Sequence, residues 1–154
     1  MLLPQTAEYA LRAVLHLAST DGVVRVPDLA IAIDVPQNYL AKTMHHMARS
    51  GLLRSTRGPA GGFRLAVPSS EIPLQRVVAL FEEPRDRRCL LGTGPCGKNP
   101  GCLVHERWRP IAEQIESFFR STTIADLLER GLSFPAGVTV SSTLGRAVAS
   151  PVEA

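Results

Sequence analysis

The spacing of apolar residues predicts three helices in the first third of the chain. Thr6 to Ser19 repeats apolar residues every three or four positions, the pattern of an amphipathic helix that begins at a capping threonine. Pro27 is a favoured first residue for a second, shorter helix. A third helix is expected to begin near Pro36 and to end at Gly51. The apolar positions expected to be buried on these helices are Leu11, Val14, Leu15, Ala18, Leu29, Ala30, Ile33, Leu40, Met44 and Met47.

After Gly51 the pattern changes to short extended segments and then returns to helical spacing. Residues 52–56 (LLRST) and 63–67 (FRLAV) flank the sequence RGPAGG, which predicts a tight β-hairpin. A short helix is predicted for residues 74–81. Thr123 and Asp126 form a capping box for a last helix that ends at Gly131. A long helix before it is predicted by an apolar stripe with helical spacing, formed by Val104, Trp108, Ile111, Ile115 and Phe118.

Composition agrees with a mainly α-helical fold that carries one small β-hairpin. Aromatic residues make up only 5% of the 154 residues, which favours helical packing of aliphatic side chains over a sheet sandwich. The N-terminal sequence lacks the basic and apolar regions of a signal peptide. No segment approaches the ~20 apolar residues that span a bilayer. We therefore expect a cytoplasmic protein that does not bind a membrane.

The charge of the chain is unevenly distributed. The formal net charge is only +3, but residues 35–70 contain no Asp or Glu. The basic residues of this window are Lys42, Arg49, Arg54, Arg57 and Arg64. A basic window without acids is typical of a protein that binds phosphates, and its alternative is an ordinary solvated basic surface.

Three helices followed by a β-hairpin is the order of a winged helix-turn-helix, in which the third helix reads the major groove of DNA. Arg57 precedes the Gly-rich hairpin tip, where a guanidinium can enter a minor groove and glycines allow close approach to phosphates. The alternative is a helical protein-interaction domain with a surface hairpin. The polar side chains expected to point away from the apolar face of the third helix are Gln37, Asn38, Tyr39, Lys42, His45 and His46.

All three cysteines lie on one Gly-rich segment between the predicted helices. Six residues separate Cys89 from Cys96, five separate Cys96 from Cys102, and two separate Cys102 from His105. Thiolates bind zinc, copper(I) and iron–sulfur clusters, and these spacings are longer than the CxxC of most zinc sites. The spacing favours a cluster, with a structural zinc site or three reduced thiols as alternatives. An enzyme is disfavoured because nothing beyond Cys102 and His105 builds a catalytic pocket.

These motifs together are similar to those of a known family. The segments that carry the similarity are EYALRAVLHLA, VPQNYLAKTMHHMARSGLLRSTRGPAGGFRLA, the three cysteines, and CLVHERWRPIAEQIESFF with TIADLL. From about Leu3 to about Gly131 the chain resembles the IscR/NsrR group of bacterial winged-helix regulators, of the Rrf-two type. The resemblance implies a homodimeric transcription factor, often a repressor, that binds operator DNA. It also implies that an iron–sulfur cluster changes this binding in response to cluster supply, iron, oxidants or nitric oxide.

The resemblance also implies roles for individual residues. The cluster, of the [2Fe–2S] or the [4Fe–4S] type, is expected to be bound by Cys89, Cys96 and Cys102. Its fourth ligand is expected to be either His105, at the IscR-like position, or Glu8 of the partner subunit, at the NsrR-like position. The residues expected to contact DNA are Gln37, Asn38, Tyr39 and Lys42 on the recognition helix, and Arg57, Gly58, Gly61 and Gly62 on the wing.

The expected organisation has four parts. Residues 1–81 form the winged helix-turn-helix domain, and residues 82–103 form the cysteine-rich cluster-binding loop. Residues 104–131 form a dimerisation helix and a terminal helix, and residues 132–154 form a flexible tail. Two alternatives stay open, namely a zinc-stapled or metal-free winged-helix regulator without cluster sensing, and a cluster carrier that does not bind DNA. The acid-free basic window disfavours the carrier.

Overall fold

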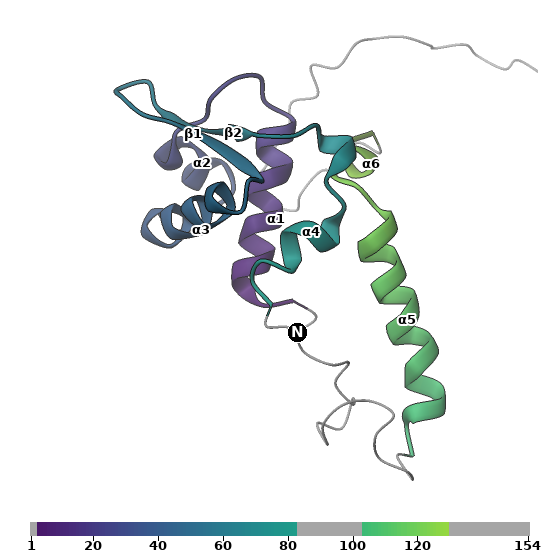
Figure 1. The fold of residues 1–154 in the computed structure, drawn as a ribbon. Coiled ribbons are helices and arrows are strands. Elements are labelled where there is room, and N and C mark those ends of the chain that lie inside the picture. The colour runs from purple at the N-terminus through teal and green to yellow at the C-terminus, as the bar shows by residue number, and fades with distance from the viewer. Residues whose placement is uncertain (1–2, 83–102, 130–154) are drawn as a thin grey trace, which may run out of the picture.

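A computed structural model describes residues 3–82 and 103–129, which form a mainly helical body with one β-hairpin (Figure 1). α1 runs through the centre, with α2, α3 and the hairpin on one side and α4 and α6 on the other. α5 packs against α4 at one end and extends beyond the body. The elements are α1 (Gln5–Ala18), α2 (Val26–Ala32), α3 (Gln37–Arg49), β1 (Leu53–Thr56), β2 (Gly62–Leu65), η1 (Ser69–Glu71), α4 (Leu74–Val78), α5 (His105–Ser121) and α6 (Ile124–Glu129).

The order of elements is the predicted one, and the fold class is confirmed as mainly α with a two-stranded antiparallel hairpin. The capping box of α6 is also confirmed. The Thr123 backbone N–H donates to Asp126 Oδ2 at 2.8 Å, and the Asp126 N–H donates to Thr123 Oγ1 at 3.2 Å. α4 is shorter than predicted and ends at Val78. The predicted cysteine-rich loop apart from its two ends, the predicted end of α6 at Gly131 and the predicted tail lie outside the described residues.

The turn between α2 and α3 sets the angle of the helix-turn-helix. Asp34 has a φ of 53°, a left-handed conformation that short polar residues tolerate better than most. Pro36 then precedes α3 in the position of an N-cap. Gly51, with a φ of 78°, ends the helix as predicted and turns the chain into β1.

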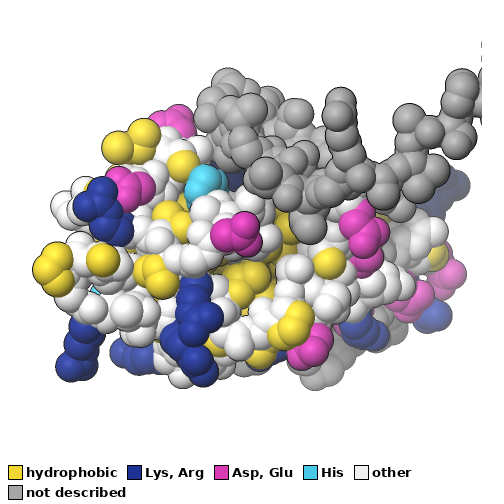
Figure 2. Space-filling view, turned by 90° about the horizontal axis from the view of Figure 1, so that it is seen from above, with side chains coloured by type: hydrophobic (Ala, Val, Ile, Leu, Met, Phe, Trp, Pro, Cys, Tyr) yellow, Lys and Arg dark blue, Asp and Glu magenta, His cyan; other side chains and the backbone are white. Residues whose placement is uncertain are grey.

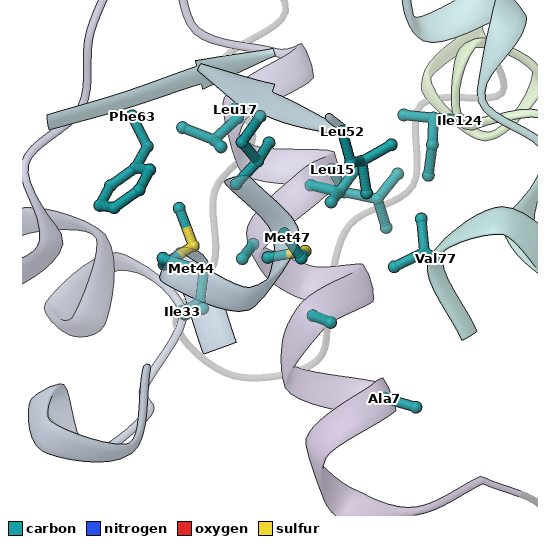
Figure 3. Close-up of a cluster of buried hydrophobic side chains, with 14 of the residues drawn as sticks. Ala7, Leu15, Leu17, Ile33, Met44, Met47, Leu52, Phe63, Val77 and Ile124 are labelled. Carbon is teal, nitrogen blue, oxygen red and sulfur yellow. The ribbon is translucent and has the colours of Figure 1, made fainter. Parts of the chain in front are cut away.

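The core joins all of these elements. Large side chains from α2, α3 and the segment before β1 pack in one core with those of α1, α4 and α6. Figure 3 shows Met44, Met47, Leu52, Val77 and Ile124 among them. α1 contributes a face that the apolar spacing did not predict, formed by the fully buried Ala7, Ala10 and Ala13. Their small side chains allow close approach of neighbouring helices. The apolar positions expected on this helix were Leu11, Val14, Leu15 and Ala18, and they did not include these three alanines.

The wing is attached to the body by a short bridge. The Val24 N–H donates to the Phe63 carbonyl, and the Phe63 N–H donates to the Val24 carbonyl, both at 2.9 Å. Gly62 lies directly against this bridge, because a Cβ built on it would be 2.2 Å from the Val24 carbonyl oxygen. The predicted wing glycine at this position therefore has a packing role in the fold.

We expect Gly62→Ala to detach the wing from the body. The new methyl group meets backbone atoms that cannot move aside, which costs about 1–3 kcal/mol of unfolding free energy. Hydrogen exchange measured by NMR should show loss of protection at the Val24 and Phe63 amides. Gly58→Ala is the control, because Gly58 has a φ of 109° and a Cβ built on it would have no other part of the chain within 4 Å. It should strain the tip but leave both amides protected, and protected amides in Gly62→Ala would contradict the packing role.

Candidate nucleic-acid interface

The outer face of α3 is polar and accessible. Gln37, Asn38, Lys42 and His45 are all exposed. Asn38, Lys42 and His45 lie on the side of the helix opposite its buried residues, and Gln37 is exposed at its N-terminal end. Gln37 and Asn38 occupy the first turn, the part of a recognition helix that reaches base edges in a major groove. Amide side chains at these positions can pair with adenine edges.

A groove lies between α3 and the wing. It has a volume of about 750 Å³ and is lined by Ala41, Lys42, His45, Ala48, Arg49 and Ser55. Two cations and two small alanines line the helix side, and Ser55 of β1 provides a hydroxyl on the other. Arg49 belongs to the basic window, but it was not among the residues predicted to contact DNA. Arg49 lines the same groove as Lys42 and lies two helical turns after it on α3.

The wing carries a second group of cations. Arg54 and Arg64 are directly opposite each other in the β1–β2 register, and both are exposed. Neither forms an ion pair with the described residues. Like charges in direct cross-strand contact destabilise a hairpin unless an anion lies between or beside them. Figure 2 shows Lys and Arg side chains gathered along the lower left edge of the molecule, where acidic side chains are not seen.

The wing tip has the geometry that was predicted from its glycines. Gly58 has a φ of 109°, a conformation that favours glycine. Gly61 lies so close to the backbone that a Cβ would be 2.4 Å from the Thr56 carbonyl oxygen. Arg57 is exposed and has no hydrogen bond or ion pair with the described residues. Its guanidinium is therefore available to an external anion.

Tyr39 has contacts within the protein as well as an exposed surface. Its hydroxyl is 2.6 Å from Thr6 Oγ1, and its ring is perpendicular to that of Tyr9 at a centroid distance of 5.7 Å. The side chain is nevertheless 44% exposed. Tyr39 thus fixes the start of α3 on the first turn of α1, and its contact with DNA stays a prediction.

The prediction that His46 points outward is wrong. His46 is half-buried, its Nε2 is 3.1 Å from the Leu80 carbonyl, and its ring lies 5.3 Å from that of Phe81. Successive residues are about 100° apart on a helix, so His46 lies on the flank that meets the end of α4. His45, one residue earlier, remains exposed and lays the edge of its ring against Phe63.

The structure describes only part of the predicted metal site, because Cys89, Cys96 and Cys102 lie outside the described residues. Glu8 is half-buried in the first turn of α1, and its carboxylate has no hydrogen bond or ion pair with the described residues. His105 is the first residue of α5 and is also half-buried. Within residues 3–82 and 103–129, no three His, Cys, Asp or Glu side chains come together as a metal site.

α5 has two apolar sides. Phe119 is buried, and Ile115 packs against the core of its own chain. Ile111 and Phe118 are 49% and 50% exposed. The apolar stripe predicted for this helix is therefore divided between the chain's own core and solvent. In the part of the chain that the structure describes, no helix has the length and apolar character needed to span a membrane.

Comparison with known sequences identifies the family. The model of the Rrf2 family, described as iron-dependent transcriptional regulators, matches residues 3–130. A protein of Aquifex aeolicus, named as a candidate HTH-type transcriptional regulator, is 37% identical over 83% of this chain and 92% of its own length. The HTH-type transcriptional regulator IscR of Yersinia enterocolitica is 32% identical over 83% of this chain and 79% of its own length.

Solved structures share the fold at lower sequence identity. T. potens IscR, 22% identical, superposes with a TM-score of 0.68 over 84% of this chain and 88% of that chain. CymR of B. subtilis, a global cysteine regulator, is also 22% identical and superposes with a TM-score of 0.71 over 83% of this chain and 96% of that chain. With the exposed α3, the wing and the matched segment taken together, this chain belongs to the Rrf2 family of winged-helix, DNA-binding transcriptional regulators.

Proposed function

We propose that the protein is a homodimeric repressor that binds operator DNA through α3 and the β1–β2 wing, and whose affinity for DNA depends on an iron–sulfur cluster. The observation that carries the cluster is the set of three cysteines at positions 89, 96 and 102, all inside the matched segment 3–130. The family description as iron-dependent supports the same conclusion.

The donor set suits a cluster. Thiolates are soft ligands that iron–sulfur clusters use, and histidine replaces cysteine as a ligand in some cluster sites. Cys89, Cys96 and Cys102 would hold the cluster with either His105 or the partner's Glu8. The half-buried carboxylate of Glu8 has no partner among the described residues and is available to a cation, which supports its candidacy. A bound cluster supplies a centre that oxidants and nitric oxide can modify.

The dimer is proposed from α5. Ile111 and Phe118 lie two turns apart on this helix and leave about half of each side chain exposed. A second copy of the chain, related by a twofold axis, would cover this surface with the same surface of its partner. A symmetric dimer would also present two recognition helices to two half-sites of an operator.

A zinc-stapled or metal-free regulator remains the alternative function. The CymR structure shows that this fold also serves a protein described as a cysteine regulator, so the fold by itself does not fix the ligand. The two functions differ in the metal content and in the presence of sulfide.

The direct test is purification under anaerobic conditions, followed by measurement of iron, acid-labile sulfide and zinc and by visible spectroscopy. The proposal predicts iron and sulfide in similar amounts and absorption from thiolate-to-iron charge transfer. Zinc without sulfide would favour the stapled regulator. Neither metal in a protein that binds DNA would favour the metal-free one.

We expect Arg57→Ala to reduce the salt dependence of DNA binding. Each phosphate contact contributes a slope of about −0.9 to the dependence of log K on log salt, so losing one contact per subunit of a dimer flattens it by about 1.8. Fluorescence anisotropy across a salt series measures this slope, and affinity should fall most for A·T-rich sequence under the wing. Arg76→Ala, an exposed cation on α4, should leave the slope unchanged. An unchanged slope and affinity in Arg57→Ala would remove the wing from the interface.

A further inference from the structure

Two side-chain hydrogen bonds tie α3 to other elements in the described part of the chain. At its first turn, Tyr39 contacts Thr6 of α1. At its last turn, His46 contacts the Leu80 carbonyl just beyond α4, a contact that spans 34 positions of sequence. The other side-chain bonds described for α3, those of Thr43 and Ser50, stay within the helix or its cap.

The geometry of the His46 contact defines the atoms involved. A carbonyl oxygen only accepts hydrogen bonds, so His46 Nε2 carries the proton and donates it to Leu80 at 3.1 Å. The ring also packs on Phe81 at 5.3 Å between centroids. The backbone at this point is itself held to α4, because the Phe81 and Glu82 N–H groups both donate to the Val78 carbonyl. His46 therefore binds a turn whose backbone is hydrogen-bonded to α4.

The position of His46 along α3 connects this turn to the DNA-reading face. His46 follows directly after His45, which lines the groove between α3 and the wing. Lys42 and Arg49, the two cations of that groove, are four residues before and three residues after His46, so both are helical neighbours of it. A helix moves nearly as a rigid element, so a displacement at Leu80 that His46 follows also displaces the groove cations.

The position of Leu80 along the chain relates the His46 contact to the cysteine-rich segment. Cys89 is seven residues beyond Glu82 in the sequence. In the described part of the chain, Leu80 and Phe81 lie between the end of α4 and the segment that leads to Cys89. Leu80 is the residue whose carbonyl His46 binds.

We propose that His46 is a positioning residue that couples the end of α4 to the recognition helix, so that the state of the cysteine ligands changes how α3 meets DNA. The proposal rests on the cluster-dependent function proposed above. A histidine with only a packing role would affect stability in both cluster states equally. A coupling histidine affects the difference in DNA affinity between the two states.

The test compares two amides that differ by one methylene. Gln places its amide nitrogen where His places Nε2, whereas Asn is too short and places it near Nδ1. His46→Gln therefore keeps a donor for Leu80, and His46→Asn removes it. For each variant, Kd is measured by anisotropy on a labelled duplex that the wild-type protein selects from a randomised library. Each protein is measured anaerobically with its cluster and again after removal of the cluster by a chelator, with a scrambled duplex as the control for non-specific binding.

We expect the ratio of the two Kd values in the wild type to lie in the range of about 5- to 150-fold that is typical of allosteric coupling. His46→Gln should keep most of this ratio. His46→Asn should bring it to within about twofold of unity, with unchanged iron content and unchanged affinity for the scrambled duplex. If His46→Asn does not fold, Phe81→Leu, which removes the aromatic contact, should reduce the ratio instead.

The outcomes separate this proposal from the function on which it rests. A wild-type ratio that persists in His46→Asn, or in Phe81→Leu if that variant has to be used, would overturn the role of His46 and leave cluster sensing intact. A ratio near unity in the wild type itself would overturn cluster-dependent binding, and the coupling role with it.

Discussion

Replacing Ile111 by aspartate is expected to convert the dimer into monomers. Ile111 is 49% exposed in one chain, so its substitution removes little from the chain's own core. In a twofold dimer each substitution appears twice, and each carboxylate would have to leave water for an apolar seam. We expect the two carboxylates together to cost about 4 kcal/mol of the free energy of dimerisation. The dimer Kd then rises about a thousandfold, since about 1.4 kcal/mol corresponds to a factor of ten. Operator binding should be lost with the dimer.

Ile111 is a better probe than Ile115, which belongs to the same predicted stripe. Ile115 packs against the core of its own chain, so a charge there would also unfold the protomer. The matched control is Ile31→Asp, because Ile31 is 82% exposed on α2, a helix that lies away from α5 (Figure 1). Sedimentation at several concentrations distinguishes the variants. A dimer in Ile111→Asp as stable as that in Ile31→Asp would place the interface elsewhere.

Replacing any one of Cys89, Cys96 and Cys102 by alanine is expected to leave a folded protein without a stable cluster. The fold should survive because the core described above is built from the helices and the hairpin on either side of the cysteine-rich segment. The cluster should be lost because the remaining two thiolates and one other ligand leave an iron open to solvent and exchange. Iron and acid-labile sulfide should both disappear, while the circular dichroism spectrum and the dimer remain. Full iron and sulfide in one variant would remove that cysteine from the ligand set.

Measurement of iron and acid-labile sulfide also assigns the fourth ligand. Glu8→Gln and His105→Gln both replace the candidate with an amide of similar size. Only the variant that loses the true ligand should lose its cluster faster on exposure to air. Mixing a Glu8→Gln chain with a Cys96→Ala chain tests whether Glu8 acts across the dimer.

Local chemistry made much of this fold predictable. The capping box of α6, Gly51 at the end of α3 and the Gly-rich hairpin each depend on a few neighbouring residues, and each was found where the sequence indicated. Features that depend on tertiary packing were not predicted. The alanine face of α1 carries a weak hydrophobic signal, and the bridge from Val24 to the wing leaves no sequence pattern.

At the candidate interface, too, the features set by local sequence were predicted and those set by tertiary packing were not. The exposure of Asn38 and Lys42 follows from helical spacing alone. The groove that adds Arg49 and Ser55 depends on how the wing packs beside α3. The inward position of His46 depends on where α4 ends. The residues that connect the interface to the rest of the molecule were therefore the ones that spacing could not identify.

The most direct test of the cluster-dependent regulator is the affinity of one wild-type preparation for DNA in its two states. Anisotropy on the selected duplex would be measured anaerobically with the cluster bound, and again after its removal, with sedimentation to confirm that both forms are dimers. We predict dimers in both states and Kd values that differ by about fivefold or more. Equal Kd values for the two dimeric forms would contradict the proposal that the cysteines sense a signal for the DNA-binding domain.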